Sequence, residues 1–282
     1  MSDPKEVTFY QFHNPPLKAG DYTIKVDQNV NNLSISKSSA TKNIYVAGER
    51  FSIESKNIFN TYPLEGTTGQ FGSVMPHITL TRSTLPWERI GAPNVKPPVN
   101  SAPPVIPWMW LFIYDDDDLA SGAVKVSKKK ALSSIFRTIK GDDSTSIINQ
   151  NDKANIDQTI SLELGESLTT TADVLQINTT LLPNVLPTND ELALLTCVRE
   201  NQIDGEATEH AICIANRLPK AGVRNYASLL SLEGRLPLPT VGSTPGLSSF
   251  VQLTSWSFSV INNNCYQVTR NGIVDLDKRI AS

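Results

Sequence analysis

The stretch Trp108–Tyr114, WMWLFIY, is the most hydrophobic segment of the chain and decides the fold class. Its aromatic and β-branched residues favour a strand, and its length is that of a strand rather than a helix. Because no polar residue alternates with the apolar ones, we expect both faces of this strand to be buried in the middle of a sheet. The apolar run around it is interrupted by Pro107 and ends before four aspartates, well short of the roughly 20 residues of a spanning helix. The sequence therefore predicts a buried central strand and no membrane span.

Alternation of apolar and polar residues predicts further strands on both sides of this segment. Segments with this pattern, or with β-favouring apolar runs, are 21–35, 77–80, 159–164, 192–200, 209–218, 226–232 and 250–261. The last four suggest an antiparallel meander. Residues 43–54 form either two short strands or one bulged strand, and residues 167–177 form either a short helix or a strand. A strand is favoured for 192–200, but Thr188–Glu191 has the capping-box pattern, so this segment can instead begin as a helix.

One segment has helical spacing, since Leu132, Ile135, Phe136 and Ile139 predict an amphipathic helix within Lys129–Lys140. The polar residues 141–158 predict a loop, and the prolines of 83–107 predict an extended arm on the surface. We therefore expect a single mainly β domain over residues 1–282, an antiparallel β-sandwich or jelly-roll-like fold with one or two short helices and this Pro-rich arm.

Composition limits the classes of partner. The 282 residues suffice to bury a core without disulfides or metals, and Lys plus Arg (25) against Asp plus Glu (28) gives a net charge of −3. No basic field exists to hold nucleic acid.

The start, MSDPKEVTFYQFHNPP, has no apolar segment typical of a secretory signal, so we expect synthesis and folding in the cytoplasm. Cys197, Cys213 and Cys265 match neither a disulfide framework nor a zinc pattern, and we interpret them as reduced thiols.

Catalytic motifs are absent from the sequence, which contains no G-x-S-x-G, H-E-x-x-H, P-loop or G-x-G-x-x-G pattern. The glycines of 66–72 lack the Lys that a phosphate-binding loop needs, so they predict a turn. His210 and Cys213 are three residues apart, and on a strand they would point to opposite faces. We therefore predict no enzyme, no catalytic residue and no cofactor.

The run Asp115–Asp118 is the strongest charge feature, and its carboxylates are candidate Ca²⁺ ligands. Adjacent residues on an extended chain diverge, and the run lacks the alternate spacing and the Gly of an EF-hand loop. A solvated, hairpin-like turn is therefore favoured over a metal site. A further hypothesis is that Lys128–Lys130 pairs with these aspartates, within the chain or in a neighbouring subunit.

Trp87, Glu88, Arg89 and Trp108 are candidate interface residues, because Trp and Arg beside prolines in extended segments anchor many protein interfaces. The alternative is that the tryptophans belong to the core, more so for Trp108 and Trp110 than for Trp87. These residues favour a non-enzymatic structural or accessory subunit that forms homo- or hetero-oligomers with other protein subunits. The rival hypothesis is a carbohydrate- or cell-surface-binding module that uses exposed tryptophans and the aspartate turn.

Several strings carry a family resemblance: LPWERIG, PWMWLFIYDDDD, ICIANRLP, YASLLSLEG and VQLTSWSFSV. They resemble strings in the N-terminal region of large, uncharacterised bacterial and fungal proteins, some of which occur beside phage-tail-like contractile injection particles. The match covers most of residues 10–260, with Met75–His77 at an LPH-like position and Ser228 where the family has His. The resemblance implies a structural role in such a particle, which is assembled in the cytoplasm and released without signal peptides. It also implies that the chain is a short form or a module, and it names no catalytic residue.

Overall fold

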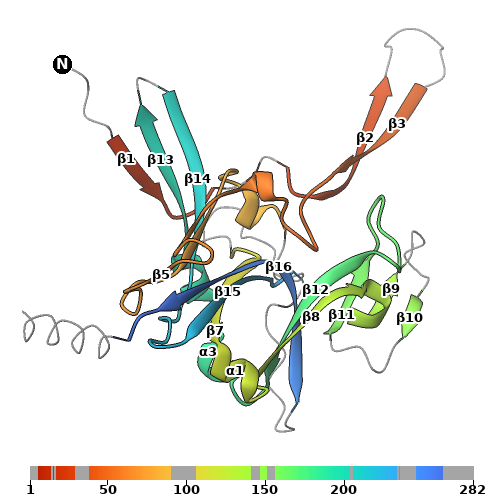
Figure 1. The fold of residues 1–282 in the computed structure, drawn as a ribbon. Helices are drawn as coiled ribbons and strands as arrows, with labels where there is room; N and C mark the ends of the chain where they lie inside the picture. The colour runs from red at the N-terminus through yellow and green to blue at the C-terminus, as the bar shows by residue number, and fades with distance from the viewer. Residues whose placement is uncertain are drawn as a thin grey trace, which may run out of the picture.

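The computed structural model describes residues 6–13, 15, 17–28, 38–89, 106–140, 147–150, 156–203, 206–233, 235 and 246–262. Strands dominate this part of the chain, most strand pairs are antiparallel and the helices are short (Figure 1). The mainly β fold class is therefore confirmed.

A central sheet contains the decisive strand. Its spatial order is β7 (Met109–Asp115), β15 (Arg224–Ser231), β16 (Leu247–Val260), β12 (Thr171–Asn178) and β8 (Val124–Ala131). The two-residue β5 (Thr68–Gly69) runs parallel to the end of β16.

A flanking sheet packs on one face of the central sheet. Its order is β1 (Glu6–Tyr10), β13 (Thr196–Ile203), β14 (Glu206–Ile214), β6 (His77–Leu80) and β4 (Ile58–Tyr62). The main core lies between the two sheets, because Leu80, Val198 and Ala211 of the flanking sheet share one buried cluster with Leu111 and Leu229 of the central sheet. This arrangement is that of a sandwich.

Strand β7 is buried on both faces, as predicted. Met109, Leu111 and Ile113 enter the main core, while Trp110 and Phe112 enter a second core on the opposite face. Two short helices, α3 (Leu182–Val185) and α4 (Asn189–Leu194), contribute side chains to this second core. Alternate residues of the strand therefore serve two hydrophobic layers, which is why the sequence shows no polar alternation.

The predicted position of β7 in the middle of the sheet is wrong, because β15 is the strand it pairs with and it lies at one end of the described order. A guanidinium donates to this strand, since Arg217 Nη1 lies 3.2 Å from the Ile113 carbonyl oxygen. The hydrophobicity of a strand indicates that both of its faces are buried, but it does not indicate how many neighbouring strands it is hydrogen-bonded to.

Two smaller sheets complete the fold. The small sheet has the order β10 (Ile147–Gln150), β9 (Phe136–Lys140) and β11 (Ile156–Ser161), with β11 parallel to β9. The β2–β3 ribbon consists of β2 (Gly20–Gln28) and β3 (Ser38–Val46), and it projects away from the packed sheets (Figure 1). The remaining short elements are η1 (Ser55–Asn57), η2 (Leu85–Trp87), α1 (Asp116–Ala120) and α2 (Leu132–Ile135).

The predicted helix over 129–140 is wrong. Strand β8 continues to Ala131, one helical turn follows as α2, and β9 begins at Phe136. Leu132, Ile135, Phe136 and Ile139 are all buried in the main core. The helical spacing arose because a turn and the strand after it each bury two residues, so two different local structures together reproduce a 3.6-residue pattern.

Two predicted irregular segments also need correction. Residues 83–89 of the expected Pro-rich arm are packed into the body, with Leu85 and Trp87 fully buried, while residues 90–105 lie outside the described part. The expected polar loop 141–158 contains β10 and the start of β11, and its remaining residues lie outside the described part. Both corrections have the same cause: pairing or burial by distant segments overrides local polarity and proline content.

The predicted strands 77–80, 209–218, 226–232 and 250–261 are confirmed to within a few residues. The antiparallel meander is wrong, because β13 and β14 pair in the flanking sheet whereas β15 and β16 pair in the central sheet. Residues 43–54 contain the end of one strand, β3, and residues 167–177 contain the strand β12. The capping box at Thr188–Glu191 is confirmed and begins α4, after which β13 starts at Thr196.

Candidate functional site

The two predicted interface tryptophans, Trp87 and Trp108, belong to the main core, with an exposed fraction of 0% each. Trp108 Nε1 donates a 2.8 Å hydrogen bond to the Leu85 carbonyl oxygen, which ties η2 to the start of β7. Glu88 is half-buried and accepts from Thr84 Oγ1 at 2.7 Å. The alternative that the tryptophans are core residues is the one observed, so they offer no surface to a partner or a sugar.

Arg89, the fourth candidate, is 3% exposed and lies at the centre of a group of half-buried charges. Its two Nη atoms lie 2.9 and 3.0 Å from the two carboxylate oxygens of Glu163, and Nη1 lies 3.2 Å from Glu233 Oε1. Its Nε donates to the Glu49 carbonyl oxygen. This forked contact with a carboxylate requires a planar guanidinium, so an Arg rather than a Lys fits the position.

Arg50 is a second buried guanidinium, 8% exposed. Its Nη1 lies 2.7 Å from Glu166 Oε2 and 3.0 Å from the Ser161 carbonyl oxygen, and its Nε lies 3.2 Å from Glu233 Oε2. Glu233 therefore bridges the two arginines. We call Tyr45, Arg50, Arg89, Glu163, Glu166 and Glu233 the ion cluster.

The ion cluster joins segments that are far apart in the sequence. Its members come from the end of β3 and the residues after it, from the turn after η2, from the loop after β11 and from the turn after β15. With two arginines and three glutamates it carries one excess negative charge. Since both guanidinium groups are shared among carboxylates and carbonyl oxygens, each arginine and each glutamate of the cluster has more than one partner, while Tyr45 is tied to Glu163.

The pKa values in the ion cluster follow its geometry. Burial of Glu163 disfavours its charged form, but hydrogen bonds from Arg89 and Tyr45 and the charge of Arg50 outweigh burial and lower its pKa from 4.5 to about 2. Burial raises the pKa of Glu166, which Arg50 offsets only in part. Burial and the hydrogen bond to Glu163 raise the pKa of Tyr45 to about 12. Glu163 is therefore firmly ionised, whereas the charged form of Glu166 is disfavoured.

Acid should weaken the fold through this cluster. The folded-state pKa of Glu163 lies below its value of 4.5 in an unfolded chain, so its stabilisation is present above pH 4.5 and is lost as the pH falls towards about 2. Protonation of Glu166, whose pKa is raised, offsets part of this loss. We expect the free energy of unfolding to fall by about 2 kcal/mol over this range through Glu163. Urea unfolding of the wild type and of Glu163→Gln at several pH values measures it, and an equal pH slope in both proteins would contradict the assignment.

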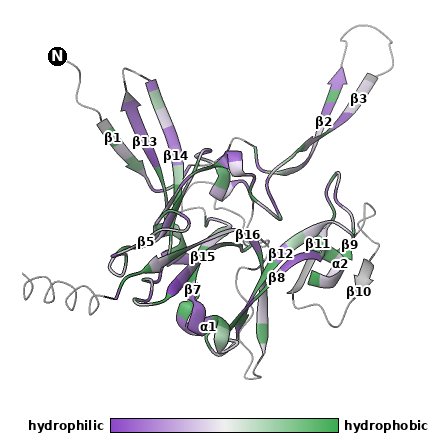
Figure 2. Ribbon diagram, viewed as in Figure 1, coloured by the Kyte–Doolittle hydropathy of each residue, from purple (hydrophilic) through white to green (hydrophobic). Residues whose placement is uncertain are grey.

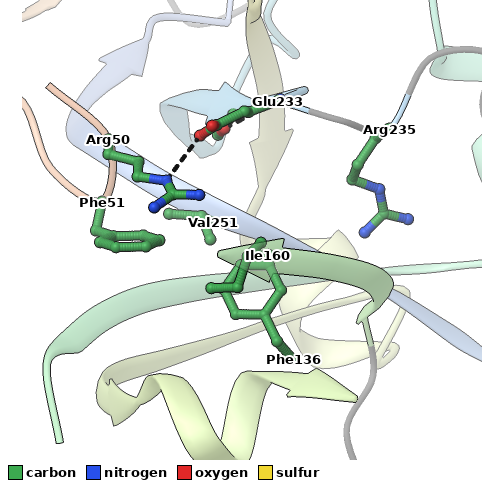
Figure 3. A pocket seen from close by; sticks show the side chains of 8 residues that line it. Arg50, Phe51, Phe136, Ile160, Glu233, Arg235 and Val251 are labelled. Atoms are coloured by element: carbon green, nitrogen blue, oxygen red, sulfur yellow. Dashed lines mark hydrogen bonds and ion pairs between the residues drawn. The ribbon is translucent and has the colours of Figure 1, made fainter. Parts of the chain in front are cut away.

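A cavity beside the ion cluster has a volume of about 10 Å³, which is room for one water molecule. Figure 3 shows Arg50 and Glu233 on one side of it and Arg235 on the other. The complete lining is Arg50, Phe51, Phe136, Ile160, Ser231, Glu233, Arg235 and Val251. A substrate does not fit in this space, so the ion cluster is suited to clamping chain segments together.

The clamped segments include the root of the β2–β3 ribbon. The Tyr45 hydroxyl, on β3, donates to Glu163, and the Ala19 amide, next to β2, donates to the Glu88 carbonyl oxygen at 2.9 Å. A Cβ on Gly48 would lie 2.7 Å from Ala19 Cβ, so the two chain segments approach too closely there for any residue but glycine. The ion cluster therefore holds the base of the ribbon against the body.

Beyond its root the ribbon is exposed. Tyr22, Ile24 and Val26 lie on one face with Ile44, and the exposed fractions of the three aliphatic side chains are 47%, 58% and 41%. In Figure 2 green hydrophobic segments alternate with purple hydrophilic ones along these strands. Isolated two-stranded ribbons are marginally stable in water, and exposed apolar residues aligned on one face mark an interaction surface.

The flanking sheet presents a second exposed apolar area on its outer face. Phe9 and Phe59 are 61% and 56% exposed, and Phe59 packs on His210 with the ring centroids 4.4 Å apart and the rings tilted by 31°. Arg199 is opposite both Phe9 and His210 in the strand register. The outer face of the flanking sheet thus offers exposed aromatic side chains, in addition to the exposed aliphatic side chains of the ribbon.

The run Asp115–Asp118 does not form the expected hairpin-like turn. The Asp115 carboxylate caps the N-terminus of α1, accepting from the Asp117 and Asp118 amides at 2.8 and 3.1 Å. Asp117 and Asp118 pair with Lys220 and Arg217 at 2.6 and 3.1 Å. Because cations of the chain already occupy these carboxylates, the run is explained as a charged helix start.

The described residues show no pairing of Lys128–Lys130 with these aspartates, and Lys128 Nζ instead lies 2.9 Å from Asp173 Oδ2. In the described ranges, no group of three or more His, Cys, Asp or Glu side chains is placed to hold a metal ion.

Cys213 and His210 point to opposite faces of β14, as predicted: Cys213 lies in the main core and His210 packs against Phe59 on the outer face. Burial raises the pKa of Cys213 to about 12 and also raises that of Cys197, so neither thiol is an activated nucleophile. Cys265 lies outside the described part of the chain.

A polar groove of about 230 Å³ lies beside β8 and β12. Its lining consists of Ser127, Lys130, Ser134, Ile135, Val174, Gln176 and Ser249. Sugar sites commonly stack a ring on an aromatic side chain, and this lining contains none. The groove therefore does not supply the aromatic platform that the carbohydrate hypothesis requires.

Comparisons with protein-family models, with curated proteins and with solved structures give no match for this chain. No helix in the described ranges is long and apolar enough to cross a membrane. The geometry of the ribbon, its clamped root and the exposed apolar surfaces is thus the basis for assigning a function.

Proposed function

We propose that the chain is a structural subunit of a larger protein assembly and that the β2–β3 ribbon is its docking element. The observation that carries the proposal is the ribbon itself, which bears three exposed aliphatic side chains on one face and is clamped at its root by the ion cluster. A rigid root fixes the direction of the ribbon, so little conformational freedom is lost on docking.

Sheet edges and apolar faces in water favour association with another protein. The resemblance of the LPWERIG, ICIANRLP and YASLLSLEG strings to proteins found beside phage-tail-like particles makes such a particle the assembly we propose. The rival carbohydrate-binding function is less favoured, because all four tryptophans, Trp87, Trp108, Trp110 and Trp256, are buried.

The test removes the apolar character of the ribbon without touching the body. The triple variant Ile24→Thr, Val26→Thr, Ile44→Thr keeps β-branched side chains, so we expect the free energy of unfolding to change by less than about 1 kcal/mol. In its native cells, the tagged wild-type chain should sediment with a large complex and the triple variant should not.

The matched control replaces exposed leucines away from the ribbon. Leu194 and Leu218 are 72% and 49% exposed, and the variant Leu194→Thr, Leu218→Thr should sediment as the wild type does. Unchanged sedimentation of the ribbon variant would overturn the proposal.

A further inference from the structure

The ribbon has an unpaired edge along β2. Strands β2 and β3 pair in continuous antiparallel register from Gly20 opposite Val46 to Gln28 opposite Ser38, with no bulge. Within the described residues each strand pairs only with the other. In an antiparallel pair, alternate residues direct their N–H and C=O groups outward, so β2 offers a row of free donors and acceptors to a further strand.

The charges of β2 lie on one face and alternate in sign. Asp21, Lys25 and Asp27 share this face, while Tyr22, Ile24 and Val26 share the other. The side chains of Lys25 and Asp27 are about two-thirds exposed, and Nζ of the first lies 3.7 Å from a carboxylate oxygen of the second. Strand β3 carries a single charge, Lys42, and so has no complementary pattern of its own.

From this pattern we infer that β2 pairs with β2 of a second copy of the chain, antiparallel about a two-fold axis at Thr23. This inference rests on the proposed function, because it names the first partner of the ribbon. In this register Asp21 lies opposite Lys25 of the second copy, and the symmetry repeats the pair. On the other face Tyr22 lies opposite Ile24 of the second copy. The result is a four-stranded sheet in the order β3, β2, β2, β3.

Other registers fit the charges or the length of the strand less well. An axis at Ile24 places Asp21 opposite Asp27, and an axis at Lys25 places that lysine opposite itself. An axis at Val26 pairs Lys25 with Asp27 but engages only Ile24–Gln28 of β2, whereas the axis at Thr23 engages Gly20–Val26. Three or more strands with an apolar face reach the stability that an isolated ribbon lacks.

The test exchanges charges and measures the mass of the purified full chain by sedimentation equilibrium at low salt. The wild type should have twice the monomer mass of 30.9 kDa. Asp21→Lys and Lys25→Asp each place like charges opposite one another twice, so each should raise the dimer Kd by about tenfold or more. A mixture of these two variants should form the heterodimer, because each mixed pair is again Asp opposite Lys. The chain carrying both substitutions should dimerise as the wild type does.

Asp27→Lys is the matched control, since it makes the same charge change on the same strand outside the paired stretch. It should not raise the Kd, because losing the 3.7 Å contact with Asp27 leaves Lys25 free to pair with Asp21 of the second copy. A monomeric wild type, or single variants that dimerise normally, would overturn the inference. Loss of dimerisation in Asp27→Lys with no effect of Asp21→Lys would also overturn it, in favour of the axis at Val26. The two proposals can fail separately. If charge exchange changes the mass of the purified protein but the ribbon variant still sediments with the large complex in cells, the inferred dimer stands and the proposed function fails. If charge exchange has no effect but the ribbon variant no longer sediments with the complex, the proposed function stands and the ribbon binds another partner.

Discussion

Replacing Arg89 with methionine should lower the free energy of unfolding by about 3–5 kcal/mol, because it removes a fully buried guanidinium and leaves the half-buried Glu163 and Glu233 without part of their compensating charge. Methionine retains most of the apolar stem, so the loss reports the guanidinium rather than packing. Urea unfolding at pH 7, followed by circular dichroism, measures the change.

Two further variants separate the causes. Arg89→Lys keeps the charge but cannot make the two-pronged contact with Glu163, so it should recover only part of the loss. Arg82→Met removes a 42% exposed guanidinium from its pair with Glu88 and should lower stability by less than about 1 kcal/mol. If Arg89→Met and Arg82→Met destabilised the protein equally, the ion cluster would not be the clamp described above.

Replacing Trp108 with alanine should lower the free energy of unfolding by about 3–5 kcal/mol. The indole is fully buried in the main core, and its Nε1 hydrogen bond to the Leu85 carbonyl oxygen is lost with it. Thermal and urea unfolding, both followed by circular dichroism, measure the change without relying on tryptophan fluorescence.

Two comparisons sharpen this result. Trp108→Phe keeps an aromatic ring but removes the donor, so it should fall between the wild type and the alanine variant. Phe9→Ala deletes a ring that is 61% exposed and should change the stability by less than about 1 kcal/mol. A small effect of Trp108→Ala would contradict its assignment to the core and favour the interface role expected from the sequence.

Much of the fold could be predicted because strand patterns are local. The alternation in 21–35 and the apolar run at 108–114 each predicted a strand, and the structure contains β2 up to Gln28 and β7; residues 29–35 lie outside the described part. The helix expected at 129–140 failed because Leu132 and Ile135 lie in a turn and Phe136 and Ile139 in a strand, all buried by partners distant in the sequence. Periodicity reports which residues are buried, and it does not distinguish one helix from a turn followed by a strand.

The candidate site was predicted only through one of its members. Arg89 was singled out for its place beside Trp87, but as an interface residue, and its partners Glu163 and Glu233 are 74 and 144 residues away in the sequence. Nothing local marks these glutamates as half-buried, since glutamate is usually solvated. Their one common signal is the string Ser-Leu-Glu, in which the serine is the last residue of a strand, β11 or β15, and this gives a position but no partner.

The sequence by itself determined the mainly β class and the strand buried on both faces, because a strand's alternation and hydrophobicity are properties of adjacent residues. It also placed the charges of β2 on one face and its apolar residues on the other. Only the tertiary structure decided that β7 lies at the end of its sheet, that Trp87 and Trp108 are core, and that Arg50 and Arg89 share three glutamates at the root of a projecting ribbon. Those properties depend on which distant segments come into contact. Arginines and glutamates that are usually solvated are then packed together, and their ion pairs hold the base of the ribbon against the body.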